Sequence, residues 1–468
     1  MVTLYERAAE LGGMALSTAE GRLPGSGVSW LGGCGEDGPV RRILTELGLA
    51  DRIEEVDPLY VAQIGADQMV VPADPERWRA ELCEKFPEEG AGITRFIEEL
   101  ISAEDDLERL TYGEPPTDIL MRYDDQTVGA WLKPLVQSPE ARAFLTLPWI
   151  LAGLPPSLLS AARFAEVWHS LHVRRAGRLP RGVSDLVQAL REVLLDAGGV
   201  IRTGSPVTRV IRRGGRVEGV VLQDGTEHRA DAIAAAIDPT DLFEDLMMDP
   251  DQLQAGYPPL RRGFVTSLSA LQATAEVTLS TPTAVRTKLY QKSPDAEAAY
   301  RDLQASIPDF DAFTLTVQPL GPVGPEGEER SLLCATGPVP YNRPDRWDVP
   351  FPERRTHEFD QKESYLDLRH EMGWELLERA AALISDSVLD EDSERFEGPL
   401  EVERRAFAAG GAAFGWAALS DQSGMYAPGA STTFRGLFVA GSWVYPGGSI
   451  SGALQSAERA AQEILRSL

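Results

Sequence analysis

The residues with the clearest chemical potential lie near the carboxyl end, in GLFVAGSWVYPGGSISGALQSAERAAQEILRSL, residues 436–468. The apolar run 437–440 is long enough for a buried strand and too short for a helix. A turn rich in glycine and proline follows, and helical periodicity from Ser451 predicts an inner stripe of small residues at Ala453, Ala457, Ala460 or Ala461, and Ile464. Such a turn lets backbone N–H groups approach an anion or an electron-rich ring. An ordinary strand-to-helix corner explains this segment equally well.

A second signal lies at the amino end, in VTLYERAAELGG. Glu6 ends a strand-like alternation and is followed by the pair Gly12 and Gly13. In a dinucleotide-binding βαβ unit, a carboxylate at the tip of the second strand holds a ribose hydroxyl pair, about 20 residues after the glycine-rich turn of the first strand. Counting back that far from Glu6 passes Met1. We therefore expect the printed chain to start inside such a motif.

Together the two ends resemble the flavin-binding amine oxidase and phytoene desaturase superfamily, above all its desaturase-like branch. A third segment, residues 178–239, is similar to the part of the family in which a Pro–Gly turn begins a helix and hairpin strands follow. The family has these three segments in this order. The resemblance implies an α/β fold in which a Rossmann-type FAD-binding domain is interleaved with an α+β substrate domain of antiparallel sheet plus helices.

The resemblance also implies how the chain is divided. Its expected parts are FAD-binding segments at 1–72, 178–240 and 401–468, a helical substrate region at 73–177, and a substrate domain at 241–400. Apolar alternation between Gly263 and Thr336 independently predicts an antiparallel sheet in the last of these. A stretch rich in proline and charge, 340–363, is expected to be a loop or a lid.

Site residues are implied by the same resemblance. Glu6 would hold the adenosine ribose of FAD, the Gly12–Gly13 turn would approach the cofactor, and Val207 would lie beside the adenine. The ribityl chain and ring would lie along Gly441, Pro446, Gly447, Gly448, Ser449, Ile450 and Gly452. Trp443 and Tyr445 would wall the substrate side. None of these residues is an obvious acid or base, so no catalytic proton carrier is named.

Several departures from the family pattern stand beside these matches. The family's opening strand and its GxGxxG turn are not found ahead of Glu6. A formal GxGxxG at Gly33–Gly38 contains Glu36 and Asp37, which would put two carboxylates against phosphate charge, so we interpret it as coincidental. Met14 stands where the family usually has a basic residue, and aromatic residues occupy a turn that is often small or hydrophilic.

Composition excludes several classes of protein. A net charge of −27 makes sequence-independent nucleic-acid binding unfavourable and would repel an anionic membrane. The three cysteines are widely spaced, with no CxxC pair, which favours a reducing cytoplasm over a disulfide framework. No apolar run reaches the roughly 18 residues of a spanning helix. We expect a cytoplasmic protein whose membrane contact, if any, is peripheral; its oligomeric state is not indicated.

Other clusters are interpreted as structural. Glu166, His169 and His172 share a helical face, but the helix around them is apolar and no partner cluster exists, so we expect no metal site. The acidic run between 98 and 108 is expected to be a solvated helix face, and the basic cluster at 174–181 a solvated surface or a phosphate contact. The apolar stretch 144–168, broken by prolines, predicts two short buried helices that border either a substrate tunnel or the core.

The predicted function is therefore an FAD-dependent oxidoreductase of the phytoene desaturase type, acting on a large apolar substrate similar to a carotenoid or isoprenoid. The first alternative is a flavin-free escort protein that binds lipid or prenyl groups on the same scaffold, and the second is an amine oxidase. No Ser/His/Asp or Cys/His arrangement supports hydrolysis. That absence suits a flavoenzyme, where the ring accepts electrons and the protein supplies position and electrostatics.

The chain as printed is expected to hold flavin weakly or in less than equimolar amount. A helix amino terminus after a glycine turn is what neutralises a pyrophosphate, and no such element is recognisable ahead of Glu6. Visible absorption after gel filtration measures the bound flavin. A full, tightly held complement would contradict this expectation.

Overall fold

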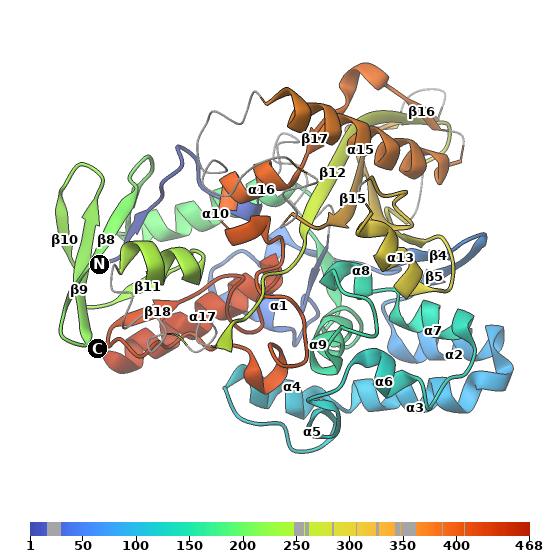
Figure 1. The fold of residues 1–468 in the computed structure, drawn as a ribbon, viewed down its shortest axis with the longest axis horizontal. Coiled ribbons are helices and arrows are strands. Elements are labelled where there is room, and N and C mark those ends of the chain that lie inside the picture. The colour runs from blue at the N-terminus through green and yellow to red at the C-terminus, as the bar shows by residue number, and fades with distance from the viewer. Residues whose placement is uncertain are drawn as a thin grey trace.

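The computed structural model describes residues 1–15, 30–247, 257, 262–282, 285–305, 307–323, 327–341, 347, 362–385, 387–406 and 408–468. Most of the expected lid segment 340–363 lies outside these residues. The described chain mixes helices and sheets, and Figure 1 shows the helices gathered around two separate sheet regions. The expected α/β fold class is confirmed.

One eight-stranded sheet dominates the side of the molecule that carries the middle of the chain (Figure 1). Its strands, in spatial order, are β16 (Ser387–Leu389), β12 (Ser269–Leu279), β15 (Glu329–Val339), β14 (Ala312–Pro319), β13 (Thr287–Gln291), β4 (Tyr60–Ile64) and β5 (Asp67–Val71), with β17 (Arg395–Glu397) also paired to β12. The strands between 269 and 339 pair antiparallel, as their apolar alternation predicted. Helix α15 (Glu363–Ala382) packs against β12 and β15, and α13 (Ala296–Leu303) against β14.

Residues 60–71, which lie within the expected first FAD-binding segment 1–72, form strands of the large sheet. Strand β4 pairs in parallel with β13, with Val61 opposite Lys288, so the β4–β5 hairpin belongs to the large sheet. Alternation of apolar and polar residues identifies a strand and its buried face, but it carries no information about which distant strand will be the partner.

The other sheet region joins the two ends of the chain to its middle. Strand β1 (Thr3–Tyr5) pairs in parallel with β7 (Val200–Arg202), and β18 (Leu437–Val439) pairs in parallel with β11 (Ile233–Ala235). The smaller antiparallel sheets are β8 (Val207–Arg213), β9 (Arg216–Leu222) and β10 (Glu227–Arg229), and β2 (Trp30–Gly32), β6 (Ala176–Arg178) and β3 (Glu54–Glu55). The accompanying helices are α1 (Pro39–Glu46), α10 (Val183–Asp196), the π-helical turn η4 (Asp241–Leu246), α16 (Pro399–Ala406) and α17 (Ile450–Ser467).

The helical region, residues 75–172, contains eight α-helices in the described chain. They are α2 (Pro75–Lys85), α3 (Gly90–Ile101), α4 (Glu104–Thr111), α5 (Ile119–Tyr123), α6 (Val128–Leu132), α7 (Pro139–Thr146), α8 (Trp149–Ala152) and α9 (Ala161–His172). Side-chain oxygens cap several of their amino ends, including Ser160 at α9. Phe144, Trp149 and Phe164 of the apolar stretch are all buried in the main core. The stretch therefore serves packing along most of its length.

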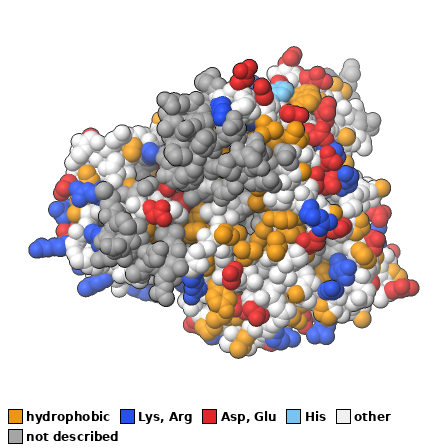
Figure 2. All heavy atoms as spheres, in the orientation of Figure 1, with side chains coloured by type: hydrophobic (Ala, Val, Ile, Leu, Met, Phe, Trp, Pro, Cys, Tyr) orange, Lys and Arg blue, Asp and Glu red, His pale blue; other side chains and the backbone are white. Residues whose placement is uncertain are grey.

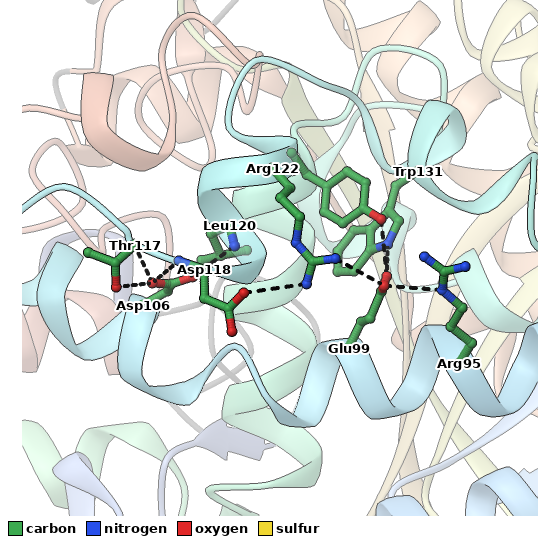
Figure 3. A network of polar contacts seen from close by, with 9 residues as sticks. Arg95, Glu99, Asp106, Thr117, Asp118, Leu120, Arg122 and Trp131 are labelled. Atoms are coloured by element: carbon green, nitrogen blue, oxygen red, sulfur yellow. Dashed lines mark hydrogen bonds and ion pairs between the residues drawn. The ribbon is translucent and has the colours of Figure 1, made fainter.

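The acidic run at 98–108 is not uniformly solvated, which corrects our expectation at two positions. Asp106 is only 2% exposed, and its carboxylate accepts the backbone N–H groups of Thr117 (2.7 Å), Asp118 (3.2 Å) and Leu120 (2.8 Å) (Figure 3). These are the N–H groups at the start of α5, which have no acceptor within that helix. Asp106 therefore fixes α5 against α4.

Glu99 makes the second buried contact of this run. Its carboxylate accepts Trp131 Nε1–H at 2.7 Å and the Tyr123 hydroxyl at 3.2 Å, and it pairs with Arg95 and Arg122 (Figure 3). Charge alone predicted that Glu99 is solvated. Its carboxylate is instead needed as an acceptor, because Tyr123 and Trp131 bring an O–H and an N–H group into the core.

The arginines of the basic cluster after α9 are paired with carboxylates from other segments. Arg174 lies 3.7 Å from Glu104, Arg175 3.3 Å from Asp74, and Arg178 2.8 Å from Glu54. These pairs do not leave an unopposed row of cations for a phosphate. Figure 2 shows acidic and basic side chains interspersed over much of the visible face, with basic side chains gathered at the edge formed by β8–β10. Among the described helices, none is long and apolar enough to cross a membrane.

We predict that Asp106→Ala lowers the free energy of unfolding by about 3 kcal/mol, because the N–H groups of Thr117 and Asp118 and the buried N–H of Leu120 lose their acceptor. Urea unfolding followed by circular dichroism measures the change. Glu108→Ala is the matched control, since Glu108 is exposed on the same helix and its loss should change stability by less than about 0.5 kcal/mol. Equal effects of the two substitutions would contradict the buried role of Asp106.

Candidate functional site

A turn between β18 and α17, residues 441–449, forms the centre of the candidate site. The backbone has positive φ at Gly441 (+91°) and Gly447 (+55°). A Cβ at Gly447 would lie 2.6 Å from the carbonyl oxygen of Ser442, so the turn can close only with glycine there. At Gly441 no atom lies within 4 Å of the Cβ position, so the backbone faces open space. Ser449 caps α17 by accepting the N–H of Gly452 at 3.0 Å.

Ser456 of α17 holds the start of this turn, and sequence reasoning missed it. Its fully buried hydroxyl accepts the Gly441 N–H at 2.9 Å and also lies 2.9 Å from the Gly441 carbonyl oxygen. The predicted apolar stripe of α17 is correspondingly wrong at Ala457, which is exposed, while Ser451, Gly452, Ser456 and Ala460 are buried. The helix is rotated from the expected stripe because a polar contact with the turn, rather than apolar packing alone, sets its inner face.

The three residues Trp443, Val444 and Tyr445 enter three different hydrophobic clusters. Tyr445 belongs to the main core of the helical region and large sheet, Val444 packs with Leu437 and Val439 of β18, and Trp443 packs with Ala408 and Ala412. Each side chain is less than 9% exposed. The turn therefore lies where three parts of the core meet.

Arg163 of α9 holds the other end of the turn. Its guanidinium donates to the carbonyl oxygens of Pro446 and Gly447 and pairs with Glu166, whose Oε2 is 2.7 Å away. A charged pair inside an otherwise apolar helix was a signal available in the sequence, because ionisable groups are buried mainly when they are paired.

A cavity of about 520 Å³, counted with its open mouth, lies beside the turn. We call it the aromatic cavity, because its wall includes Phe414, Trp416, Val444, Tyr445 and Trp443, and the indoles of Trp416 and Trp443 meet edge to face with centroids 5.0 Å apart. The expected substrate-side residues Trp443 and Tyr445 thus line the same space. From the apolar stretch 144–168, Ala152 and the pair Arg163–Glu166 reach it.

A second cavity, of about 350 Å³ with its opening, lies on the other side of Tyr445 and Pro446. We call it the polar cavity, because Glu166, His169, Ser170, Arg174, Thr111 and Gln455 line it. Glu166, Tyr445 and Pro446 line both cavities. Burial raises the pKa of Glu166, although Arg163 and Arg174 act in the opposite direction.

The expected residues of the amino-terminal half lie elsewhere. Glu6 directly follows β1, where its N–H donates to Arg202 and its Oε1 accepts the N–H of Ala8 at 2.7 Å. Gly12 and Gly13 lead into the short helix η1 (Gly13–Ala15), which packs against α16, and Val207 begins β8 opposite Leu222. Within the described chain, no hydrogen bond joins Glu6, Gly12, Gly13 or Val207 to the turn at 441–449.

The formal GxGxxG loop at Gly33–Gly38 is packed against protein. The N–H groups of Cys34 and Gly35 donate to Arg175 and Arg174, and Gly33 donates to Ser170. The loop is thus occupied by contacts with the end of α9, which supports interpreting its spacing as coincidental. Among the described residues, the one group of carboxylates close enough to share an ion is Asp302, Asp309 and Asp311, and it does not include Glu166 or the histidines of α9.

Comparison with known proteins establishes the class of this chain. The family profile described as flavin containing amine oxidoreductase matches residues 1–305 and 397–465. The chain therefore belongs to the flavin-containing amine oxidoreductase family, which is a family of flavin-dependent oxidoreductases, and the resemblance drawn from its two ends and middle segment is confirmed.

Two curated relatives carry more specific names. A hydroxyneurosporene desaturase from Cereibacter sphaeroides is 27% identical over 306 residues, which are 65% of this chain and 57% of that protein. A 4,4'-diaponeurosporene oxygenase from Staphylococcus haemolyticus is 26% identical over 292 residues, 60% of this chain and 53% of that protein. The matched part thus spans just over half the length of both relatives.

Solved structures agree on the fold. An oxidoreductase from Methanosarcina mazei aligns with a TM-score of 0.60 at 16% identity, over 98% of this chain and 94% of that one. A protein from Pyrococcus furiosus aligns with a TM-score of 0.57 at 13% identity, over 100% of this chain and 92% of that one. At these identities the likeness concerns the arrangement of the chain.

The residues of the turn fit the flavin that the family carries. Gly441 offers open backbone, the N–H groups of Ile450 and Ser451 in the first turn of α17 have no acceptor among the described residues, and the aromatic cavity adjoins them. An electron-rich ring can use these three features: close approach of the backbone, N–H donors at a helix amino terminus, and an aromatic flank.

We predict that Ser456→Ala lowers the free energy of unfolding by about 1 kcal/mol and weakens flavin binding, because the partly buried N–H of Gly441 loses its acceptor beside the open face of the turn. Urea unfolding and titration of flavin fluorescence measure the two effects. Ser467→Ala makes the same chemical change at the exposed end of α17 and should alter neither quantity. Wild-type flavin affinity in the Ser456 variant would remove this hydroxyl from the site.

Proposed function

We propose that this chain is an FAD-dependent oxidoreductase that removes hydrogens from a long apolar molecule similar to a carotenoid. The observation that carries the proposal is the aromatic cavity beside the flavin-compatible turn. The cavity is lined by aromatic side chains and is open to solvent, so a long substrate could extend outward from it. The names of the two curated relatives point to the same substrate class.

The charges of the aromatic cavity favour an uncharged substrate. The two charged side chains that line it, Arg163 and Glu166, neutralise each other at 2.7 Å. An ammonium substrate would need an unpaired carboxylate or an aromatic cage with a polar approach, because transfer of a cation from water into an apolar space is costly. The same pairing leaves an apolar chain in contact with Phe414, Trp416 and Trp443.

The roles within this proposal follow the family resemblance. Glu6 would hold the ribose of FAD, Gly12 and Gly13 would approach the cofactor, and Val207 would lie near the adenine. The ring would be held by Gly441, Pro446, Gly447, Gly448, Ser449, Ile450 and Gly452. The flavin, when bound, supplies a two-electron oxidant. The chain's own residues position the substrate and exclude water, with Trp443 and Tyr445 as the wall.

The proposal also keeps the interleaved organisation, with the β4–β5 hairpin transferred to the substrate sheet. We further propose a cytoplasmic protein that meets membranes only peripherally, since a carotenoid-like substrate dissolves in lipid. The three cysteines support the reducing compartment: Cys34, Cys83 and Cys334 are all unpaired.

The deciding experiment reduces bound flavin without oxygen. We expect a polyene carotenoid precursor to bleach the flavin absorption faster than any member of a panel of primary amines. Faster reduction by an amine would overturn the substrate class and favour an amine oxidase. A chain that binds the polyene tightly, holds no flavin and reduces none would favour the escort protein instead.

A matched pair of variants ties this activity to the cavity. Trp443→Leu should slow reduction by the polyene about 10-fold, because an aromatic contact of the cavity wall is lost. Trp374→Leu is the control. Trp374 lies on α15, packs against Phe396 of β17 and does not line the cavity. Similar rates for both variants would place the substrate elsewhere.

A further inference from the structure

A polar stripe on α9 connects the two cavities. Arg163 and Glu166 line the aromatic cavity, and Glu166, His169 and Ser170 line the polar cavity, followed by Arg174 just beyond the helix. Glu166 is the one residue of α9 that reaches both spaces, and the rest of the wall between them is formed by Tyr445 and Pro446. The helix thus offers a polar route around the aromatic ring of Tyr445.

His169 is unusual within this stripe. The residue is 1% exposed, and neither ring nitrogen has a hydrogen-bond partner among the described residues. Burial, with a smaller contribution from Arg174, lowers the pKa of His169 from its ordinary 6.5 to about 3, so the ring is neutral near physiological pH. A neutral imidazole offers one N–H donor and one lone pair; both nitrogens of His169 are buried, and the residue lines the polar cavity.

We propose that Glu166 accepts the proton released from the substrate and that His169 passes it on through the polar cavity. This inference rests on the proposed function, because a proton must be accepted only if hydrogens are removed. Forming a carbon–carbon double bond breaks two C–H bonds. A bound oxidised flavin would supply the acceptor for one hydrogen with its electron pair, and the other hydrogen leaves as a proton, which forms a new O–H bond on the Glu166 carboxylate.

The surroundings of Glu166 suit a group that gains and loses a proton. Burial raises its pKa toward the working range of a general base, while the Arg163 ion pair at 2.7 Å keeps the carboxylate form populated. The other titratable groups facing it are Arg174, His169 and Tyr445, and burial raises the pKa of Tyr445 so that it stays neutral. The polar residues contributed by α4 and α17 are the uncharged Thr111 and Gln455.

His169 is the next residue of the polar stripe after Glu166 on α9. Protonated Glu166 can donate toward His169 by way of water, and the imidazole then releases a proton from its other nitrogen. Because His169 does not hold a positive charge at working pH, the proton moves on rather than accumulating beside Arg174.

The first test follows Glu166 without any substrate. Infrared difference spectra of the purified flavoprotein, recorded while pH is raised, should show loss of a protonated-carboxyl band in the wild type. The band should be absent from Glu166→Gln, which keeps the side-chain volume and leaves Arg163 bonded to Pro446 and Gly447. The matched control His172→Gln should retain it, since His172 is buried on α9 but lines neither cavity. A band that persists in Glu166→Gln would overturn the proposal.

The second test follows the proton itself during anaerobic flavin reduction by the polyene. The wild-type rate should rise with pH as Glu166 loses its proton, because only the carboxylate can accept another. Glu166→Gln should lower this rate about 10²–10⁴-fold and remove the pH dependence. His169→Gln should delay the appearance of the proton in bulk water relative to flavin reduction, read with an indicator dye, whereas His172→Gln should not.

The two proposals fail in different ways. Wild-type rate and pH dependence in Glu166→Gln would refute the relay and leave the oxidoreductase standing. No reduction of wild-type flavin by the polyene would refute the proposed function, and the relay with it, even where the infrared band belongs to Glu166. A proton release in His169→Gln that matches His172→Gln would remove His169 from the route.

Discussion

The contact of the Arg163 guanidinium with the carbonyl oxygens of Pro446 and Gly447 is the interaction on which the site depends. It joins a helix of the helical region to a turn more than half the chain away. Because its remaining charge is met by Glu166, the guanidinium can be buried in an apolar wall without leaving an unpaired ion. One side chain thereby fixes the shape of the turn beside the aromatic cavity.

The turn is equally constrained from its other sides. Trp443, Val444 and Tyr445 enter three separate hydrophobic clusters, and the Ser456 hydroxyl accepts the N–H of Gly441. Movement of the turn would have to disturb all three clusters at once. A site that positions a flat cofactor against a substrate needs this kind of support, since its geometry is then set by packing rather than by the ligand.

The sequence predicted what local pattern and order along the chain can carry. The strand–turn–helix at 437–467, the antiparallel strands between 269 and 339 and the family itself were all accessible from spacing and resemblance. Long-range partners were not: alternation marked residues 60–71 as strands without revealing β13 as their neighbour. Charge counting placed Asp106 and Glu99 in solvent. The N–H groups that their carboxylates accept reach them only when α5 and α6 pack, and charge counting carries no information about that packing. Arg163 and Ser456 were missed for the same reason, as their partners are backbone groups of a distant turn.

The pairing of β4 with β13 also bears on how the chain is made. During synthesis the β4–β5 hairpin leaves the ribosome long before residues 287–291 are made. The edge of β4 that pairs with β13 therefore stays unpaired while the helical region is synthesised. β1 waits in the same way for β7. Chaperones that shield strand edges would therefore matter most for the first seventy residues, and a slower decoding of the segment before β13 would lengthen their exposure.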